Sequence, residues 1–229
     1  MKLSIIIPVY NEISTIEEIL KRVERVEIDK EIIVVDDGST DGTTELLKSL
    51  NTDNATVVYH NHNMGKGRAI RDALPLTRGD IIIIQDADLE YNPEEYLRLI
   101  KPIKKGEAEV VYGSRTLGKK PHYDSLLGWL FYLGGRSLTI ITNILYRGHL
   151  TDEPTCYKVF RAEVLKSIPI KSRGFEFCPE VTAKLLKKGI RIFEIPISHK
   201  PRSYKDGKKI RPRDWVIAVW TLLKYRFLN

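Results

Sequence analysis

Short runs of β-branched residues alternate with helical patterns along the first half of the chain. Strands are predicted where apolar residues follow one another without a break, and helices where they recur at helical spacing, as at Ile16, Ile19, Leu20 and Val23. This alternation is typical of an α/β protein with a mostly parallel, Rossmann-like sheet flanked by helices. The predicted strands are Leu3–Val9, Glu31–Val35, Thr56–Tyr59 and Asp80–Ile84, and the predicted helices are Ile13–Val26, Thr43–Leu50 and Lys66–Leu74.

The pattern in the second half is less regular. Neither an internal repeat nor a low-complexity linker divides the chain, and its 229 residues favour a single domain, 1–229. The predicted elements here are helices at Pro93–Lys104 and Glu176–Lys188, strands at Glu109–Gly113 and Arg191–Ile197, and a glycine-rich basic loop at Gly113–Tyr123.

Polar residues follow three of the predicted strands: Tyr10 to Glu12, Asp36 to Ser39, and Gln85 to Asp88. Ligands of open parallel sheets bind beyond the carboxyl ends of the strands, so these clusters are expected to meet on one rim. Asp86 and Asp88 flank the small Ala87 and offer oxygen ligands to a hard divalent cation. An isolated Asp-x-Asp triplet is equally typical of a solvated turn, but its position at a strand end favours a metal site.

Charge and cysteine content narrow the possible partners. The net charge of +7 suits anionic partners such as nucleotide phosphates, nucleic acid or an acidic membrane face. No motif typical of nucleic-acid binding occurs, which disfavours nucleic acid as a partner. The two cysteines lack zinc-type spacing and the N-terminus lacks a signal-peptide cleavage site, so a cytoplasmic protein is expected.

Two apolar stretches are candidates for contact with a membrane. Leu126–Tyr146 is interrupted by Arg136, and an arginine in mid-bilayer is costly, so a spanning helix is not expected. Trp215–Leu228 is shorter than the roughly 20 residues that a span requires. Its aromatic residues beside Lys224 and Arg226 fit an amphipathic helix at the membrane interface, or equally one that packs on the domain.

An ordered series of motifs resembles family 2 glycosyltransferases with the GT-A fold. The resemblance spans about the first 115 residues and ends in Gly113-Ser114-Arg115. It implies a nucleotide-sugar half, 1–115, and an acceptor half, 116–229, with interfacial helices. The series consists of Pro8-Val9-Tyr10-Asn11-Glu12, Val34 to Thr43, Asn63-Met64-Gly65-Lys66-Gly67 and Asp86-Ala87-Asp88.

The resemblance implies roles for the matching positions. Asp37 is expected to contact the base or ribose, and the triplet Asp86-Ala87-Asp88 to bind Mg²⁺ or Mn²⁺ together with the donor diphosphate. The glycines around Lys66 lie at a predicted helix start, where free amides favour an anion. The nucleotide pocket is expected to be lined by Pro8, Tyr10, Glu12 and Val35.

The second half is similar to the branch of dolichyl-phosphate mannose and polyprenyl-phosphate glucose synthases. Arg115 and Arg202 are implied to bind phosphates, with a lysine that is either Lys208 or Lys209. A hydroxyl acceptor must lose a proton and needs a base, whereas a lipid phosphate is already largely ionised. The candidate bases are Asp152 first, then Glu176 and Glu180, for which helix N-terminal charges are the alternative reading. The motifs behind this resemblance are Leu150 to Asp152, Thr155 to Arg161, Gly174 to Glu180, Glu194 to Ile197, and Arg202 with Gly207 to Lys209.

These features predict an inverting, metal-dependent glycosyltransferase that is peripheral on the inner face of the cell membrane. Asp88, Arg115 and Asp152 are its expected catalytic residues. The donor is expected to be a GDP- or UDP-sugar and the acceptor a polyprenyl or dolichyl phosphate; the inverting outcome comes from the resemblance alone. The alternatives are a saccharide or protein hydroxyl acceptor, or a noncatalytic nucleotide-sugar-binding module. The sequence leaves the donor base, the sugar and the oligomeric state open.

Overall fold

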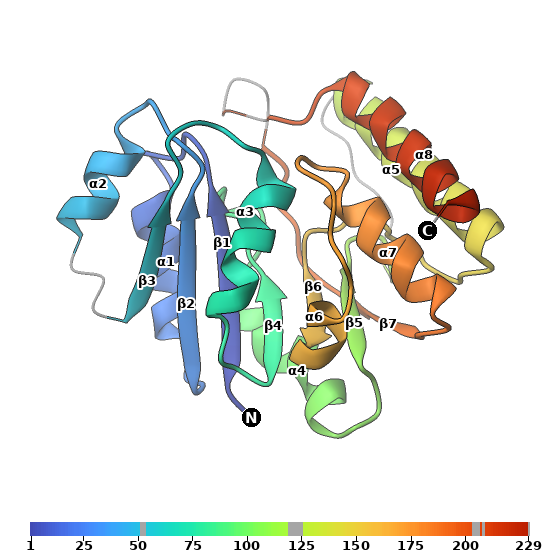
Figure 1. Cartoon of the computed structure of the whole chain (residues 1–229), viewed down its shortest axis with the longest axis horizontal. Coiled ribbons are helices and arrows are strands. Elements are labelled where there is room, and N and C mark those ends of the chain that lie inside the picture. Colours follow the sequence, from blue (N-terminus) through green and yellow to red (C-terminus); the bar gives the residue numbers. More distant parts are fainter. Residues whose placement is uncertain (51–53, 119–125, 203–206, 208, 229) are drawn as a thin grey trace.

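The computed structural model describes residues 1–50, 54–118, 126–202, 207 and 209–228. These residues form one sheet of seven strands in the order β3-β2-β1-β4-β6-β5-β7 (Figure 1). All neighbouring strands are parallel except β6, which is antiparallel to both β4 and β5. The strands are β1 Leu3–Val9, β2 Lys30–Asp36, β3 Ala55–Tyr59, β4 Ile81–Ile84, β5 Val110–Ser114, β6 Lys158–Arg161 and β7 Ile192–Pro196.

Helices cover both faces of the sheet, which is why β4 and most of β1 are continuous apolar runs. Figure 1 shows α3 in front of β1, whereas α1 and α4 lie behind the sheet. The helices are α1 Ile16–Arg25, α2 Thr43–Ser49, α3 Lys66–Ala73, α4 Tyr96–Lys104, α5 Leu126–Tyr146, α6 Ala162–Lys166, α7 Phe177–Lys187 and α8 Pro212–Phe227, and the 3₁₀ turns are Leu74–Leu76 and Pro93–Glu95.

The predicted α/β class and mostly parallel sheet are confirmed, with three differences in the elements. Helix α1 begins at Ile16 and not at Ile13, since residues 13–15 form a turn in which the backbone N–H of Ile13 donates to the Asp41 carboxylate. The helix predicted from Pro93 starts with a 3₁₀ turn. Strand β6 and helix α6 were missed, and the predicted loop 113–123 lies partly outside the described residues.

A second, smaller core joins α5, α7 and α8 beside the main one. Figure 1 shows α5 and α8 side by side at the right of the molecule. Trp215 of α8 donates its indole N–H to the Gly134 carbonyl and the Ser137 hydroxyl of α5, at 3.2 and 3.0 Å. The buried residues of this second core are Leu138, Tyr146, Ala183, Ala218, Leu222 and Tyr225.

The antiparallel strand β6 brings a distant segment to the functional edge of the sheet. Because β6 runs against its neighbours, its first residue, Lys158, lies at the edge where β4 and β5 end. The segment 150–157 before β6 therefore lies beside the segments that follow the parallel strands. This edge gathers residues 10–12, 37–39, 85–90 and 115–118, together with 150–157 and 197–202.

Candidate active site

Arg202 connects the ends of two strands across this edge. Its guanidinium donates two hydrogen bonds to the carboxylate of Glu12, at 3.0 and 2.8 Å, and lies 3.3 Å from Asp88. Lys209 also binds Glu12. The expected meeting of the segments after β1 and β4 is thus confirmed, and two of the predicted phosphate-binding cations, Arg202 and Lys209, lie with them. The other candidate, Lys208, lies outside the described residues.

Asp86 is paired with the lysine that begins α3. The ammonium nitrogen of Lys66 lies 2.5 Å from Asp86 Oδ1 and 3.4 Å from the sulfur of Cys156. Burial by itself would raise the pKa of Asp86, but the charge of Lys66 outweighs it and holds the pKa below its usual range. Asp86 is therefore an anion under ordinary conditions, as a metal ligand must be.

Asp88 lies in a much less favourable environment for a negative charge. Burial and the nearby carboxylates of Asp86 and Glu90 together raise its pKa to about 7, because the charge of Arg202 offsets only part of their effect. Glu90 was not among the site residues predicted from the sequence. Its position two residues after Asp88, in the same alternation as Asp86 and Asp88, was the available signal. Excess negative charge at this point is the environment that a divalent cation neutralises best.

The donor set fits Mg²⁺ or Mn²⁺ bound together with a phosphate group. Asp86 and Asp88 lie after β4 with partly accessible side chains, 21% and 14% exposed. Within the described part of the chain, no three His, Cys, Asp or Glu side chains are arranged to hold a metal by themselves. Mg²⁺ is commonly held by one or two carboxylates, with substrate phosphates completing its shell. The metal is thus expected to bind tightly only with the donor.

Metal binding should weaken in acid because of Asp88. A cation competes with the proton for this carboxylate, whose pKa is about 7. The apparent affinity for Mn²⁺ in the presence of a nucleoside diphosphate should be constant above pH 7 and fall by about tenfold per pH unit below it. Calorimetric titration between pH 5.5 and 8.5 measures this dependence. An affinity that does not change over this range would contradict competition between the proton and the metal at Asp88.

The predicted nucleotide-pocket residues are not equally accessible. Pro8 and Tyr10 are partly exposed at the end of β1 and can face a ligand. Val35 is fully buried in the main core, so its side chain supports β2 and has no access to a ligand. Ala87 is also part of this core. Of these positions, Pro8 and Tyr10 at the end of β1 keep partly exposed side chains.

Asp37 binds backbone amides, a structural role that the sequence did not indicate. It is 3% exposed, and its carboxylate accepts the backbone N–H groups of Met64 and Gly65 at 2.8 and 2.7 Å. Its Oδ1 also lies 2.7 Å from Nδ1 of His60, which has no assigned role in the sequence reading. Asp37 therefore holds the loop before α3 against β2, and its contact with a base or ribose stays a prediction.

The amides at the start of α3 are not open to an anion as expected. Those of Gly67 and Arg68 donate to the carbonyls of Gly174 and Arg173, at 3.2 and 3.0 Å. A Cβ on Gly65 would lie 2.3 Å from the Arg173 carbonyl oxygen, which explains a glycine there. This motif docks α3 against the loop 172–174 and directs Lys66 at Asp86.

Arg115 and Asp152 form a bidentate ion pair on the other side of the site. Asp152 accepts the backbone N–H and Nε of Arg115 at 2.8 and 2.7 Å on one oxygen, and Nη2 at 2.7 Å on the other. Burial by itself would raise the pKa of Asp152, but the Arg115 charge and hydrogen bonds hold it below its usual range. A carboxylate with a lowered pKa is a weak proton acceptor, so this geometry favours a positioning role for Asp152.

The two other candidate bases support the loop 171–174. Glu180 is fully buried and accepts the backbone N–H groups of Lys171 and Ser172, at 2.8 and 2.6 Å. Glu176 accepts those of Arg173 and Gly174, at 2.8 and 3.0 Å. Structural hydrogen bonding, rather than proton transfer, is what the structure shows for both.

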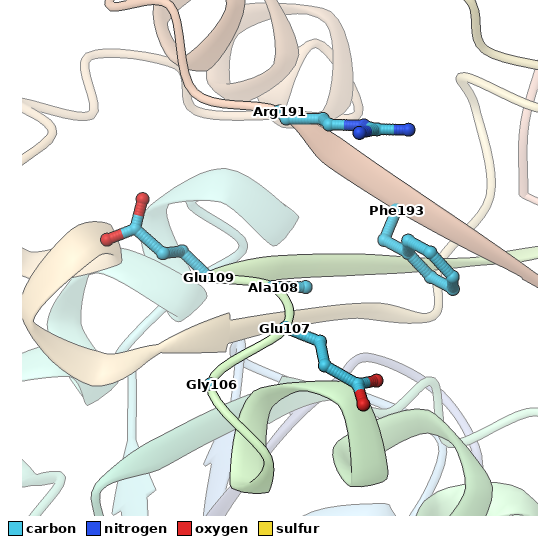
Figure 2. A pocket seen from close by; sticks show the side chains of 6 residues that line it. All are labelled: Gly106, Glu107, Ala108, Glu109, Arg191 and Phe193. Carbon is cyan, nitrogen blue, oxygen red and sulfur yellow. The ribbon is translucent and has the colours of Figure 1, made fainter.

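A cavity at the opposite edge of the sheet takes no part in this site. It has a volume of about 230 Å³ and lies where β5 and β7 begin, whereas the metal motif follows the carboxyl end of β4 (Figure 2). Its lining residues are Gly106, Glu107, Ala108, Glu109, Arg191 and Phe193.

Comparison with known proteins decides the family. Residues 4–168 match the model of Glycosyl transferase family 2. The chain belongs to this family. The match confirms the predicted family and the prediction of a glycosyltransferase. It covers the ends of β1, β2 and β4, and so includes Glu12, Asp86 and Asp88, as well as Arg115 and Asp152.

Three curated relatives are similar over nearly the whole chain. An undecaprenyl-phosphate mannosyltransferase of Micrococcus luteus is 29% identical over 91% of this chain and 87% of its own length. A dolichol-phosphate mannosyltransferase of Pyrococcus furiosus is 30% identical over 91% of this chain. A hexosyltransferase of low-salt glycan biosynthesis from Haloferax volcanii is 28% identical over 93%. The chain spans only 59% and 51% of the last two proteins.

Solved structures support the GT-A fold. Glucosyl-3-phosphoglycerate synthase from Mycobacterium tuberculosis, in complex with Mg²⁺ and UDP, has a TM-score of 0.75 at 22% identity. The alignment covers 100% of this chain and 80% of that one. The same synthase with Mn²⁺, UDP-glucose and phosphoglyceric acid has a TM-score of 0.74. These similarities establish the fold of this chain.

Proposed function

We propose that this chain is an inverting, metal-dependent glycosyltransferase that moves a sugar from a GDP- or UDP-sugar to a polyprenyl phosphate. It would act as a peripheral protein at the cytoplasmic face of the membrane. The family membership supports sugar transfer, and two relatives named for polyprenyl-type phosphate acceptors support this acceptor class. The observation that carries the choice is the Arg115–Asp152 pair, because it holds the first candidate base for a hydroxyl acceptor in an ion pair with a cation.

On the donor side, charge stabilisation is the main requirement. When bound, the metal neutralises the negative charge that develops on the departing diphosphate. Asp86 and Asp88 would hold it, with Lys66 keeping Asp86 ionised and in place. Arg202 and Lys209, now on Glu12, are within the same cluster and can donate to the diphosphate oxygens. Relatives by fold bind UDP with Mg²⁺ or Mn²⁺, which supports this assignment.

On the acceptor side, two arginines converge on the segment that carries Asp152. Arg115 binds Asp152 itself, and Arg136 of α5 donates to the Thr151 carbonyl at 3.3 Å. Two guanidinium groups suit a phosphate, whose oxygens they bind in pairs. Because a phosphate monoester is largely ionised near neutral pH, it needs positioning and little deprotonation. In the sequence, Arg136 only argued against a membrane-spanning helix. Its hydrogen bond with the Thr151 carbonyl gives a better reason for a charged residue at this position.

The helices next to Arg136 expose many apolar side chains. Within the described residues, no helix has the length and apolar character needed to cross a membrane. Instead, α5 and α8 lie side by side with aromatic and aliphatic residues exposed, and Lys224 and Arg226 are exposed on α8. This surface fits a lipid interface, where a polyprenyl chain would be held. Its exposed residues are Trp129, Leu130, Leu133, Ile140, Ile144, Trp215, Val216, Ile217, Trp220, Leu223, Phe227 and Leu228.

Replacing Trp220 by Glu should weaken binding to vesicles that contain anionic lipid. Trp220 is 65% exposed on α8, and losing a buried aromatic contact with lipid corresponds to a roughly 10- to 100-fold weaker affinity. Leu97→Glu on α4 is the matched control, since Leu97 is 52% exposed outside this surface. Cosedimentation with vesicles measures both. Equal binding by the two variants would contradict an interfacial role for α8.

Transfer rates with three acceptor types test the proposed acceptor. A donor panel of GDP- and UDP-sugars is first screened by thermal shift with Mg²⁺ and Mn²⁺. The best donor is then assayed with a polyprenyl phosphate, the corresponding polyprenol and a soluble saccharide. Transfer to the phosphate alone is expected. Preferred transfer to the polyprenol or the saccharide would establish a hydroxyl acceptor instead, and binding without turnover would indicate a nucleotide-sugar-binding module.

A further inference from the structure

Glu194 of β7 binds the backbone of the segment that carries Asp152. Its two carboxylate oxygens accept the N–H groups of Thr151 and Asp152, at 2.7 and 3.0 Å. Glu194 comes from the edge strand of the sheet and is 42 residues or more distant along the chain from both partners. Because one carboxylate binds two successive amides, the backbone of this turn is held in one arrangement.

Helix α5 and strand β6 hold the next residues of the same segment. Thr139 accepts the backbone N–H of Glu153 at 3.0 Å, and the ammonium group of Lys158 donates to the Glu153 carbonyl at 2.6 Å. Asn143 accepts the N–H of Leu150 and donates to its carbonyl, at 2.9 and 2.8 Å. Thr139 and Lys158 are buried, so the segment is held from inside the domain. We refer to Glu194, Thr139, Lys158 and Asn143 as the 150–153 clamp.

The clamp acts on a segment whose side chain binds Arg115. Asp152 makes three hydrogen bonds with Arg115, and so the direction of the guanidinium follows the position of Asp152. Arg136 reaches the same segment through the Thr151 carbonyl. Loops usually lie on the surface with solvated backbones, whereas this one is bound by side chains from α5, β6 and β7. Such support is typical of a segment that must hold a reacting group in a narrow range of positions.

We propose that Glu194 and Thr139 are positioning residues that hold Asp152 so that it aims Arg115 at the acceptor phosphate. This inference rests on the proposed function, in which Arg115 binds that phosphate. Neither residue touches a substrate in this scheme. Their loss should therefore lower kcat and the use of the acceptor, and leave donor binding at Asp86 and Asp88 unchanged.

Glu194→Gln tests the two hydrogen bonds that Glu194 accepts from Thr151 and Asp152. An amide has one accepting oxygen, so one of the two buried N–H groups would face an NH₂ group and lose its partner. We expect kcat to fall about 10- to 100-fold, with donor affinity unchanged. Glu31→Gln is the control for removing the charge of a glutamate that binds backbone amides, because Glu31 accepts the N–H groups of Arg78 and Gly79 on one oxygen at the opposite edge of the sheet, at 2.5 and 3.0 Å. A glutamine oxygen can accept both, so the control should keep kcat.

Thr139→Val tests the hydrogen bond that Thr139 accepts from the Glu153 N–H, without changing the charge or size of the side chain. The variant loses the acceptor for the Glu153 N–H, whereas Thr139→Ser keeps it and should restore kcat. Thr142→Val is the control on the same helix. Thr142 is also buried, and its hydroxyl has no hydrogen-bond partner among the residues that the structure describes. We expect a lower kcat for Thr139→Val and wild-type kcat for Thr142→Val.

Two readouts separate this inference from the proposed function. If the wild type transfers sugar but Glu194→Gln and Thr139→Val keep its kcat, the positioning role is wrong and the proposed function stands. If the wild type transfers no sugar to any acceptor, the proposed function is wrong. In that case hydrogen exchange still tests the clamp: the Glu153 amide should exchange faster in Thr139→Val than in Thr142→Val, and equal rates would overturn it.

Discussion

Asp88→Asn should abolish metal-dependent sugar transfer. The substitution keeps the size of the side chain and removes a charge that the metal needs, in a loop where Asp86 is the partner carboxylate. Metal stabilisation of a departing phosphate is worth several kcal/mol, so the rate should fall about 10³-fold or more. Measurement of initial rates at saturating donor and metal tests this. Full activity would refute the assignment of Asp88 as a ligand.

The same variant should not be less stable, which separates loss of metal from unfolding. Burial and nearby carboxylates raise the pKa of Asp88 to about 7, so its charged form is disfavoured in the folded protein. The charge of Asp88 therefore lowers the free energy of unfolding by its full amount above pH 7. This effect disappears as the pH falls toward the ordinary pKa of Asp, about 4. In metal-free buffer, Asp88→Asn should melt at a higher temperature than the wild type at pH 8, and at a similar temperature at pH 4.

Arg115→Lys should reduce transfer strongly while donor binding persists. Lysine keeps the charge but loses the planar fork that Asp152 orients through three hydrogen bonds. Losing the oriented contact that holds the attacking phosphate in position lowers kcat on the order of 100-fold. Donor affinity, measured by calorimetry, should stay close to the wild-type value because Asp86 and Asp88 are intact. An equal loss of donor affinity would place Arg115 on the donor phosphates instead.

Asp152→Asn distinguishes positioning from general base catalysis. If Asp152 only orients Arg115, the variant should be slower at every pH and keep the shape of the wild-type pH–rate profile. If Asp152 is a base, its loss should remove the acidic limb of that profile. The low pKa of Asp152 beside Arg115 leads us to expect the first result.

Most of the strands could be predicted because their signals are local. A strand that is buried on both faces requires consecutive apolar residues, and Ile5–Val9 and Ile81–Ile84 satisfy this within their own sequence. The antiparallel strand β6 has only four residues and begins with a lysine. That lysine, Lys158, is fully buried because it binds the Glu153 carbonyl and lies over the Tyr112 ring at 3.8 Å. No local pattern reveals such partners.

The roles of individual carboxylates depended on contacts between distant residues. Asp37 and Glu180 resemble ligand-binding or catalytic acids in the sequence, but in the structure both hold backbone amides. Glu12 and Arg202 are 190 residues apart, and only the fold brings them into one cluster. Arg136 was similarly visible as a charge in an apolar helix, but its contact with Thr151 depends on how α5 packs. Sequence thus identified the chemical groups, and folding determined which of them remain available.

Electron paramagnetic resonance of Mn²⁺ tests directly whether the loop after β4 binds a metal together with the donor diphosphate, with GDP or UDP added to the wild type and to Asp88→Asn. We predict a bound Mn²⁺ signal in the wild type that depends on the nucleotide and weakens below pH 7, in line with the raised pKa of Asp88. Binding of equal strength in Asp88→Asn, or no ternary complex in the wild type with either nucleotide, would contradict a metal site in this loop.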